Sequence, residues 1–355
     1  MTYALVADIH FHGWSAFSKV DETGQNTRLT ALLNDFRQAG EKARIAGAAR
    51  MYVAGDLFHV RGAIAPSVLI PVRDVLADLV AQGLEIRILA GNHDMEFKHS
   101  SRLGNATGGV DMIGVTLIHS TTVFEDDKVV AVPWHESTKG LREELERVAQ
   151  DLRDGMKNPG DYDLHIHAPV EGVIMGLDGI HAAWLASLGF KRVFTGHYHN
   201  HKVLEVGKVI SIGALAHHTW SDVGTEAGWL LVDHRVQHFA STCPKFADFD
   251  ADGGGEGVDD LVRGNYVRVR VKAGTKPAAV TAIRTELEKL GALGVIIQTT
   301  KELTRSRAAA AIPVSHSPGG SISVEASVSH YIKSLALAYE GVVQEMAASV
   351  LAEAV

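Results

Sequence analysis

The sequence has little cysteine and no long apolar stretch. Cys243 is the only cysteine among 355 residues, which excludes an internal disulfide and is typical of an intracellular protein. No apolar run approaches the roughly 20 residues that a helix needs to cross a bilayer. The first residues, MTYALVADIHFHG, lack the basic region of a signal peptide. We therefore expect a cytoplasmic protein that does not associate with membranes.

Positive charge is also scarce. The chain carries 34 Lys+Arg against 42 Asp+Glu, a formal net charge of −8, which argues against a protein that coats nucleic acid by itself. The distribution is uneven, because residues 261–310 carry 10 Lys+Arg and 3 Asp+Glu, a net charge of +7, between acidic flanks. This basic band is either a solvated surface with uneven charge or a phosphate-binding face, and the charge counts do not separate the two.

Histidine, in contrast, is abundant. The chain contains 19 histidines, and histidine is the commonest metal ligand among side chains. A chain of this length can form one large domain and a smaller appendage. The composition therefore directs attention to metal-binding patterns.

The first hundred residues alternate between predicted strands and helices. Strands at 3–7, 51–54 and 85–90 are separated by a helix at 27–45 and by a second helix with apolar residues from Val68 to Leu79. This alternation implies right-handed crossovers and a largely parallel sheet. Further strands are expected at 115–119, 129–132, 164–167, 192–195, 228–232 and 236–239, with a hairpin at 203–211 and helices near 138–157 and 180–188.

The pattern changes after residue 247. Residues 248–262 are acidic and rich in glycine, which predicts a linker between domains. Residues 263–303 contain the basic band and predict a small β-α-β unit. Residues 308–320 are rich in Ala, Pro, Gly and Ser and predict a loose connection, and residues 321–355 predict a helical tail.

Residues that bind metals lie where the predicted strands end. In an open α/β sheet the carboxyl ends of the strands face the ligand crevice. A mixed set of Asp, His and Asn suits Mn²⁺, Fe²⁺ or Zn²⁺, whereas an all-oxygen set would indicate Mg²⁺ or Ca²⁺. The ligands are too many for one ion, so two ions that share one carboxylate, about 3.5–4 Å apart, are expected. The four segments are Asp8-Ile9-His10, Gly55-Asp56, Gly91-Asn92-His93-Asp94 and Gly196-His197-Tyr198-His199.

The order of these segments resembles the calcineurin-like metallophosphoesterase superfamily over residues 1–240. The resemblance implies an α/β fold, a four-layer α/β/β/α sandwich over residues 1–247, with a dimetal centre between two sheets. It also implies that His93 is the catalytic imidazole. For the ions it implies Asp8, His10 and His199 on one, Asn92 and His197 on the other, and Asp56 between them.

One further histidine ligand is expected in the segment Asp163–Pro169. His165 and His167 face the same side of a strand, so their spacing alone does not separate them. His167 lies at the strand end before a proline, where the other ligands also lie, and we prefer it. Mn²⁺ is the expected metal, with Fe²⁺, Zn²⁺ or Mg²⁺ as alternatives.

The segment after Asp56 resembles one branch of the superfamily. Its protein phosphatases read G-D-x-x-D-R-G, whereas this chain reads G-D-L-F-H-V-R-G, with His59 in place of the second aspartate and Arg61 displaced by one residue. The sequence G-D-L-F-H is similar to that of SbcD-type exonucleases and their phage recombination counterparts. That likeness implies that His59 lies beside His93 and helps handle a DNA phosphate. The alternative is a polar residue that opens a loop.

The resemblance predicts a metal-dependent DNA phosphodiesterase, an exonuclease with single-strand endonuclease activity in recombination and repair. The basic β-α-β unit would cap the DNA, with phosphate contacts from Arg61, Arg263, Arg268, Arg270 and Lys272. The tail would hold the coiled coil of an SMC-like ATPase, or else pack back on the enzyme. A homodimer is compatible with this interpretation, and the compact cap favours a phage over a bacterial source.

Two alternatives to DNA cleavage remain at this point. One is a small-molecule phosphodiesterase or nucleotide pyrophosphatase, which predicts a closed pocket and no role for residues after 260. The other is an inactive scaffold, which the intact ligand set disfavours.

Overall fold

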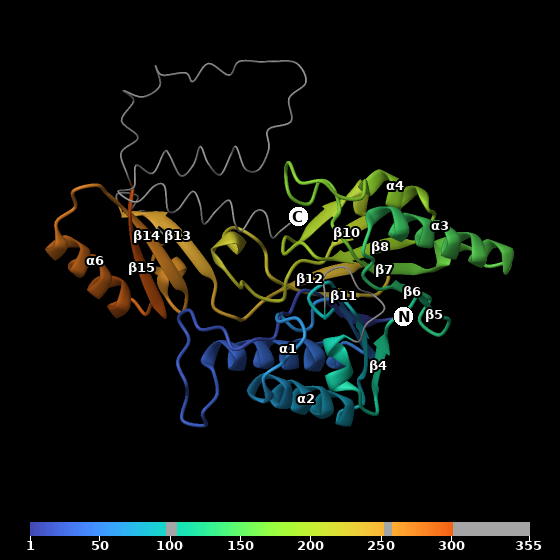
Figure 1. The fold of residues 1–355 in the computed structure, drawn as a ribbon, viewed down its shortest axis with the longest axis horizontal. Coiled ribbons are helices and arrows are strands. Elements are labelled where there is room, and N and C mark those ends of the chain that lie inside the picture. The colour runs from blue at the N-terminus through green and yellow to red at the C-terminus, as the bar shows by residue number, and fades with distance from the viewer. Residues whose placement is uncertain (97–104, 252–257, 301–355) are drawn as a thin grey trace, which may run out of the picture. The chain divides into compact units, whose positions relative to one another are not determined.

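The computed structural model describes residues 1–96, 105–251 and 258–300 (Figure 1). Within them the chain forms two six-stranded sheets and one three-stranded sheet. The predicted loose connection at 308–320 and the predicted helical tail lie outside the described residues. No described helix is long and apolar enough to span a membrane.

The first sheet has the strand order β12-β11-β1-β2-β3-β4. The four strands from the first third of the chain, β1 to β4, are parallel to one another, as the alternating pattern predicted. Strand β11 pairs antiparallel with β1, and β12 pairs antiparallel with β11. The strands are β1 (Tyr3–Val6), β2 (Arg50–Ala54), β3 (Glu85–Leu89), β4 (Val115–Ile118), β11 (Gly228–Val232) and β12 (Val236–Ala240).

The second sheet has the order β5-β6-β7-β8-β10-β9. Strands β6, β7, β8 and β10 are parallel, and the two edge strands pair antiparallel. The predicted hairpin is present, with η3 (Glu205–Gly207) at its turn. The strands are β5 (Thr122–Phe124), β6 (Val129–Val132), β7 (Asp163–His167), β8 (Arg192–Gly196), β9 (Lys202–Leu204) and β10 (Val209–Ser211).

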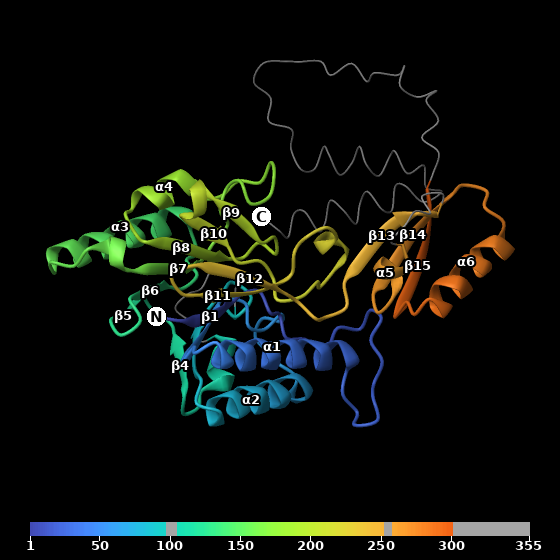
Figure 2. The same cartoon turned by 180° about the vertical axis from the view of Figure 1, so that it is seen from behind.

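Helices cover the outer face of each sheet (Figures 1 and 2). Helices α1 (Thr27–Ile45) and α2 (Pro66–Ala81) cross between strands of the first sheet, and α3 (Thr138–Asp154) and α4 (Ala182–Ser187) lie on the second. Side-chain caps fix where two of them begin: Asn26 accepts the amides of Arg28 and Leu29, and Ser137 accepts that of Gly140. Short 3₁₀ helices occupy three loops: η1 (Ala106–Val110), η2 (Pro159–Asp161) and η4 (Trp220–Asp222).

The alternation of side chains along β1 shows how the layers pack. Ala4 and Val6 belong to the core shared with α1 and α2, whereas Tyr3 and Leu5 belong to the core between the two sheets. A third core lies between the second sheet and its helices. Because successive strand residues point to opposite faces, each sheet is buried on both sides. The four-layer α/β/β/α prediction is confirmed.

The last described part is a three-stranded parallel sheet. Its elements are β13 (Phe246–Asp250), α5 (Val258–Val262), β14 (Tyr266–Lys272), α6 (Pro277–Lys289) and β15 (Gly294–Thr300), with β14 central. The expected strand, helix and strand are present. The prediction of a linker over 248–262 was wrong at both ends, because residues 248–250 lie in β13 and residues 258–262 form α5. The acidic β13 is stable beside β14 because Asp248 forms ion pairs with Arg268 and Arg270.

Candidate metal centre

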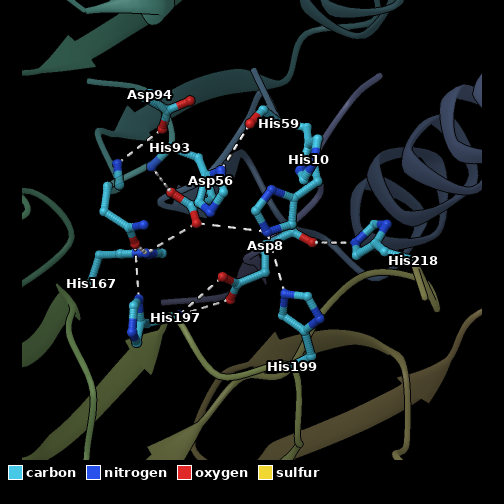
Figure 3. Close-up of polar contacts among 12 residues, drawn as sticks. Asp8, His10, Asp56, His59, His93, Asp94, His167, His197, His199 and His218 are labelled. Atoms are coloured by element: carbon cyan, nitrogen blue, oxygen red, sulfur yellow. Dashed lines mark hydrogen bonds and ion pairs between the residues drawn. The ribbon is translucent and has the colours of Figure 1, made fainter. Parts of the chain in front are cut away.

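The predicted metal-binding side chains meet at one place between the sheets (Figure 3). Asp8 and His10 follow β1, Asp56 follows β2, and Asn92 follows β3. From the second sheet, His167 ends β7, and His197 and His199 follow β8. Parallel pairing brings the carboxyl ends of neighbouring strands to the same edge of each sheet. The two edges face each other, so residues far apart in sequence converge.

The backbone at this edge is strained. Asp8, His10, Asp56 and His197 have positive φ angles of 49°, 50°, 54° and 108°. Such conformations cost about 1–3 kcal/mol each in residues other than glycine and cluster at functional sites. Hydrogen bonds between the loops hold them, since the Asp8 amide donates to Gly55 O at 3.1 Å and the His10 amide donates to Asp56 O at 3.0 Å.

Two glycines are required by the closeness of these loops. Gly55 has φ +95°, and a Cβ there would lie 2.0 Å from Nδ1 of His167. A Cβ at Gly91 would lie 2.2 Å from Oδ1 of Asp56. No side chain fits at such distances, so both loops can approach the carboxylate and imidazole groups only because these positions are glycine.

One group of donors consists of Asp8, His10 and His199. Their ligand atoms all lie within 4.8 Å of one another. Nε2 of His199 lies 3.3 Å from Nε2 of His10, and the His197 amide donates to both carboxylate oxygens of Asp8 at 3.1 and 2.9 Å. Two imidazole nitrogens and a carboxylate that converge in this way form a suitable cage for a divalent transition metal.

A second group surrounds Asn92. Its Oδ1 lies 3.0 Å from Nε2 of His167 and 2.9 Å from Nδ1 of His197. Asp56 lies between the groups, because its Oδ2 is 3.4 Å from Nε2 of His167 and 3.6 Å from Nε2 of His10. One carboxylate oxygen therefore faces an imidazole from each group, which is the arrangement expected of a bridging ligand.

The electrostatics of the cluster also suit cations. Burial, with the nearby charge of Asp56, raises the pKa of Asp8 to about 6. Burial opposes the proton on His167, but the carboxylates of Asp56 and Asp8 outweigh it and raise its pKa to about 9. Burial lowers the pKa of His197 to about 3 and keeps that imidazole neutral. Buried carboxylates that raise the pKa of a neighbouring imidazole favour positive charge at this place, and divalent ions would supply it.

The structure separates the two histidines of β7. Both rings face the first sheet, but Nε2 of His165 lies 3.1 Å from the hydroxyl of Tyr3, deep between the sheets. His167 lies at the strand end, where its Nδ1 donates to Ala54 O at 2.9 Å and its Nε2 faces Asp56. This backbone hydrogen bond fixes the proton on Nδ1 and leaves Nε2 free for a metal. His167 therefore lies in the cluster, and His165 does not.

His93 lies at the edge of the cluster, beside the other donors. Its backbone amide donates to Oδ1 of Asp56 at 2.8 Å, and its Nδ1 lies 2.8 Å from the carbonyl oxygen of His59. Its ring is 4.8 Å from that of His10 and stacks on that of His59, with centroids 5.3 Å apart and planes 16° apart. Ligand atoms of His10, His59 and His93 also lie within 4.8 Å of one another, but this third group contains no carboxylate, and Nδ1 of His93 is taken by the His59 carbonyl.

His59 occupies the place that its sequence position suggested. Its ring lies against His93 on one side and 4.3 Å from Trp14 on another. Burial, followed by the neighbouring His93, lowers the pKa of His59 to about 4, so its imidazole is uncharged at neutral pH. Its Nδ1 is buried and has no hydrogen-bond partner in the described part of the chain.

Known protein families include one that matches this chain. A family model described as calcineurin-like phosphoesterase matches residues 1–201, more than half of the chain. The chain belongs to the calcineurin-like phosphoesterase family. It is therefore a metal-dependent hydrolase of a family that uses two divalent metal ions, and its donor set fits two such ions.

More specific matches are distant. A search of curated proteins found no match to the chain. Similar solved structures include a dimetal phosphatase from Danio rerio, at 12% identity over 65% of this chain and 91% of that one, with a TM-score of 0.41. They also include the nuclease MPE from Pseudomonas putida, at 16% identity over 67% of this chain and 87% of that one, with a TM-score of 0.30.

Two residues that support the site of this phosphoesterase, Asp222 and His218, escaped the sequence analysis, whereas Asp94 belongs to a segment that it named. Oδ1 of Asp222 lies 2.7 Å from Nδ1 of His199 and so orients that ring. Nε2 of His218 lies 2.9 Å from the carbonyl oxygen of Asp8. The buried carboxylate of Asp94 accepts backbone amides of the loops after β2 and β3, which makes it a structural residue of the site. The segment H-H-T-W-S-D at 217–222 was a visible signal, but it ends no predicted strand.

The arginines expected to contact DNA lie in different surroundings. Arg61 lies at the centre itself, where its Nε donates to Asn92 O at 3.1 Å. Arg268 and Arg270 face Asp248 on β13, at 2.5 and 2.8 Å, and Arg270 also pairs with Asp250. Phosphate contacts from these two would have to compete with carboxylates. The other two, Arg263 and Lys272, are exposed.

Proposed function

We propose that this phosphoesterase is a two-metal phosphodiesterase that cleaves DNA. The observation that carries the proposal is the imidazole of His59 stacked on that of His93 at the edge of the metal centre. In protein phosphatases of the superfamily an aspartate occupies this sequence position. A neutral imidazole takes its place here, and the likeness of the segment G-D-L-F-H to SbcD-type exonucleases supports a DNA phosphodiester as the substrate.

The ligands divide between two ions. Asp8, His10 and His199 would hold the first, and Asn92, His167 and His197 would hold the second. Asp56 lies between both groups and would be shared by them. When bound, the two ions polarise the phosphate and stabilise the charge that develops on it. Mn²⁺ suits this mixture of nitrogen and oxygen donors, with Fe²⁺, Zn²⁺ or Mg²⁺ as alternatives.

His93 handles the proton of the leaving oxygen. The carbonyl of His59 accepts its Nδ1–H, which fixes the ring and leaves Nε2 to carry the second proton. His59 packs against the ring and holds its orientation, because it lies between His93 and Trp14. A proton donor positioned in this way contributes about 10²–10⁴-fold in rate.

DNA would extend from the metal centre towards the basic band. Arg61 lies beside Asn92, and two exposed residues lie further along the chain, Arg263 directly after α5 and Lys272 at the end of β14. Such phosphate contacts are independent of sequence and weaken as salt rises. The activity we infer is that of an exonuclease with single-strand endonuclease activity in recombination and repair.

The acidic charge of the chain is an argument for a partner. With a formal net charge of −8, the phosphoesterase would need a basic platform from another subunit to hold duplex DNA. A coiled-coil ATPase of the SMC type that binds residues 321–355 would supply it. A variant that ends near Pro318 is expected to cleave single-stranded DNA and to lose ATP-stimulated activity. Unfolding of that variant would assign the tail to the enzyme's own core.

Substrate comparison tests the proposed function. Purified protein is freed of metal, reloaded with Mn²⁺, and assayed on bis(p-nitrophenyl) phosphate, labelled single-stranded and duplex DNA, and cyclic nucleotides. We expect metal-dependent hydrolysis of the model diester and of single-stranded DNA. Hydrolysis of cyclic nucleotides with no cleavage of DNA would support the small-molecule alternative, and no metal-dependent hydrolysis would support a scaffold.

A further inference from the structure

We propose that Arg28 is a positioning residue that couples the three-stranded sheet to the metal centre through the segment 217–222. The inference rests on the proposed two-ion site and deepens it, because it names a route by which contacts at the three-stranded sheet would alter one ion. Neither Arg28 nor this segment was among the residues that the sequence pointed to.

The surroundings of Arg28 are unusual for a cation. The residue is only 6% exposed, yet no carboxylate of the described residues lies within ion-pair distance of its guanidinium. The rings of Trp14, Phe246 and Tyr266 lie 5.1, 5.2 and 5.4 Å from its central carbon. A buried charge without a partner is costly, and three aromatic faces offset part of this cost.

The hydrogen bonds of Arg28 lead to the metal centre. Its Nη2 donates to the carbonyl oxygen of His218 at 2.8 Å, and its Nη1 donates to that of Ala16 at 3.3 Å. The side chain of His218 in turn lies 2.9 Å from the carbonyl oxygen of Asp8. The guanidinium thus holds the backbone of His218. The imidazole of His218 contacts the metal-binding loop at Asp8, as Figure 3 shows.

Asp222 links the same segment to the metal centre. Its Oδ2 accepts the amides of His218 at 2.8 Å and Thr219 at 2.7 Å, while its Oδ1 faces Nδ1 of His199. Displacement of the His218 carbonyl would therefore move the carboxylate that orients a metal ligand. The first ion, between Asp8, His10 and His199, depends on this segment, whereas no hydrogen bond in the described residues joins the segment to Asn92 or His197.

The three-stranded sheet contacts the segment directly. The amide of Phe246 on β13 donates to Nδ1 of His217 at 3.1 Å, and the Phe246 ring lies 4.8 Å from that of Trp220. Arg268 on β14 lies over Trp220 at 4.6 Å. Tyr266 on the same strand stacks on Phe17, 5.2 Å away, next to the loop that Arg28 holds through Ala16. A shift of the sheet would therefore displace both segments that the Arg28 guanidinium binds, at Ala16 and at His218.

The first test measures the segment itself. Hydrogen exchange of the full-length, metal-free protein is compared for wild type, Arg28→Met and the control Arg37→Met. Arg37 lies on the same helix, half exposed, and pairs with Asp78 at 3.7 Å, so its replacement changes charge without touching the segment. We expect faster exchange at the amides of His218 and Thr219 in Arg28→Met alone. Unchanged exchange in a folded Arg28→Met protein would overturn the proposal.

The second test measures the ions. Titration with Mn²⁺, followed by calorimetry and by electron paramagnetic resonance, is expected to give two sites in wild type and Arg37→Met. In Arg28→Met one site should weaken by roughly tenfold, the lower end of the effect of residues behind metal ligands, with loss of the spin-coupled pair at limiting Mn²⁺. Two unaltered sites would refute the coupling. A wild-type protein that fails to bind two ions would instead refute the proposed function.

Two further variants guard against loss of folding. Arg28→Lys keeps the charge but lacks the planar fork that reaches two carbonyls, so it should weaken the same site while it remains folded. Tyr266→Leu removes a ring from the sheet side. If Arg28 carries the coupling, the Mn²⁺ affinities of the double variant Arg28→Met/Tyr266→Leu should equal those of Arg28→Met alone. If the fold-changes in Mn²⁺ affinity of the two single variants multiply in the double variant, the two residues act independently.

Discussion

Replacement of His93 by alanine should separate catalysis from metal binding. The backbone amide of His93, which donates to Asp56 at 2.8 Å, remains in the variant and continues to orient that carboxylate. The lost side chain contacts the rings of His10 and His59, but its Nδ1 binds the carbonyl of His59 and, in the described residues, the ring forms no hydrogen bond with a metal-binding side chain. We therefore expect two bound ions and slow cleavage.

The magnitude follows from the role of a proton donor. Loss of general acid catalysis costs about 10²–10⁴-fold in kcat. At about 1.36 kcal/mol for each factor of ten, this corresponds to roughly 3–5 kcal/mol of transition-state stabilisation. A substrate whose leaving group needs no proton should be less affected, so bis(p-nitrophenyl) phosphate should lose less rate than DNA does.

The assay compares kcat on both substrates with metal content measured on the same samples. His181→Ala is the matched control, because His181 is exposed and, within the described part of the chain, pairs with Glu171 and with no residue of the metal centre. The control should retain wild-type rate and both ions. If His93→Ala bound one ion fewer than wild type, His93 would be a ligand and its assignment as the proton donor would be wrong.

Three other substitutions test the cage and its support. Asp56→Ala should lose both ions and His197→Ala one of them, each abolishing activity, and calorimetry with full two-ion occupancy in both would contradict the bridged centre. Asp222→Asn should keep the fold but weaken the first ion about 10–100-fold, seen as a higher Mn²⁺ requirement; an unchanged requirement would argue against its role. Gly55→Ala should lower the free energy of unfolding by more than about 2 kcal/mol. The control Gly83→Ala, at φ +89° with open space around the Cβ, should lower it only by the cost of the backbone angle, about 1 kcal/mol. Equal losses for the two variants, measured by chemical denaturation, would contradict the steric argument.

The strand ends of the metal centre were predictable from local pattern. Apolar segments that stop at Asp8, Asp56, Asn92 and His197 indicate both the strands and their ends, because an unpaired carboxylate in the middle of a buried strand is costly. Parallel crossovers then bring those ends to one edge whatever the details of packing. The parallel part of the first sheet and the convergence of these strand ends follow from this reasoning, whereas the four layers and the division of the ligands between two ions were implied by the family resemblance.

Other features depended on contacts between distant parts of the chain. His165 and His167 share one face of β7. The packing of the two sheets places His165 against the hydroxyl of Tyr3 and His167 against Asp56. The acidic segment after residue 247 looked like a linker because the Arg side chains that neutralise Asp248 lie 20 and 22 residues further along the chain.

The support of the centre was decided by tertiary structure alone. Asp222 reaches Nδ1 of His199 across 23 residues, and Arg28 reaches the carbonyl of His218 across 190. Local sequence carries the identity of a ligand, because a metal selects the atom that binds it. The residue that orients a ligand needs only to supply a hydrogen bond from the right direction, so many residue types at many positions would serve. Only the packing of the loops decides which one does.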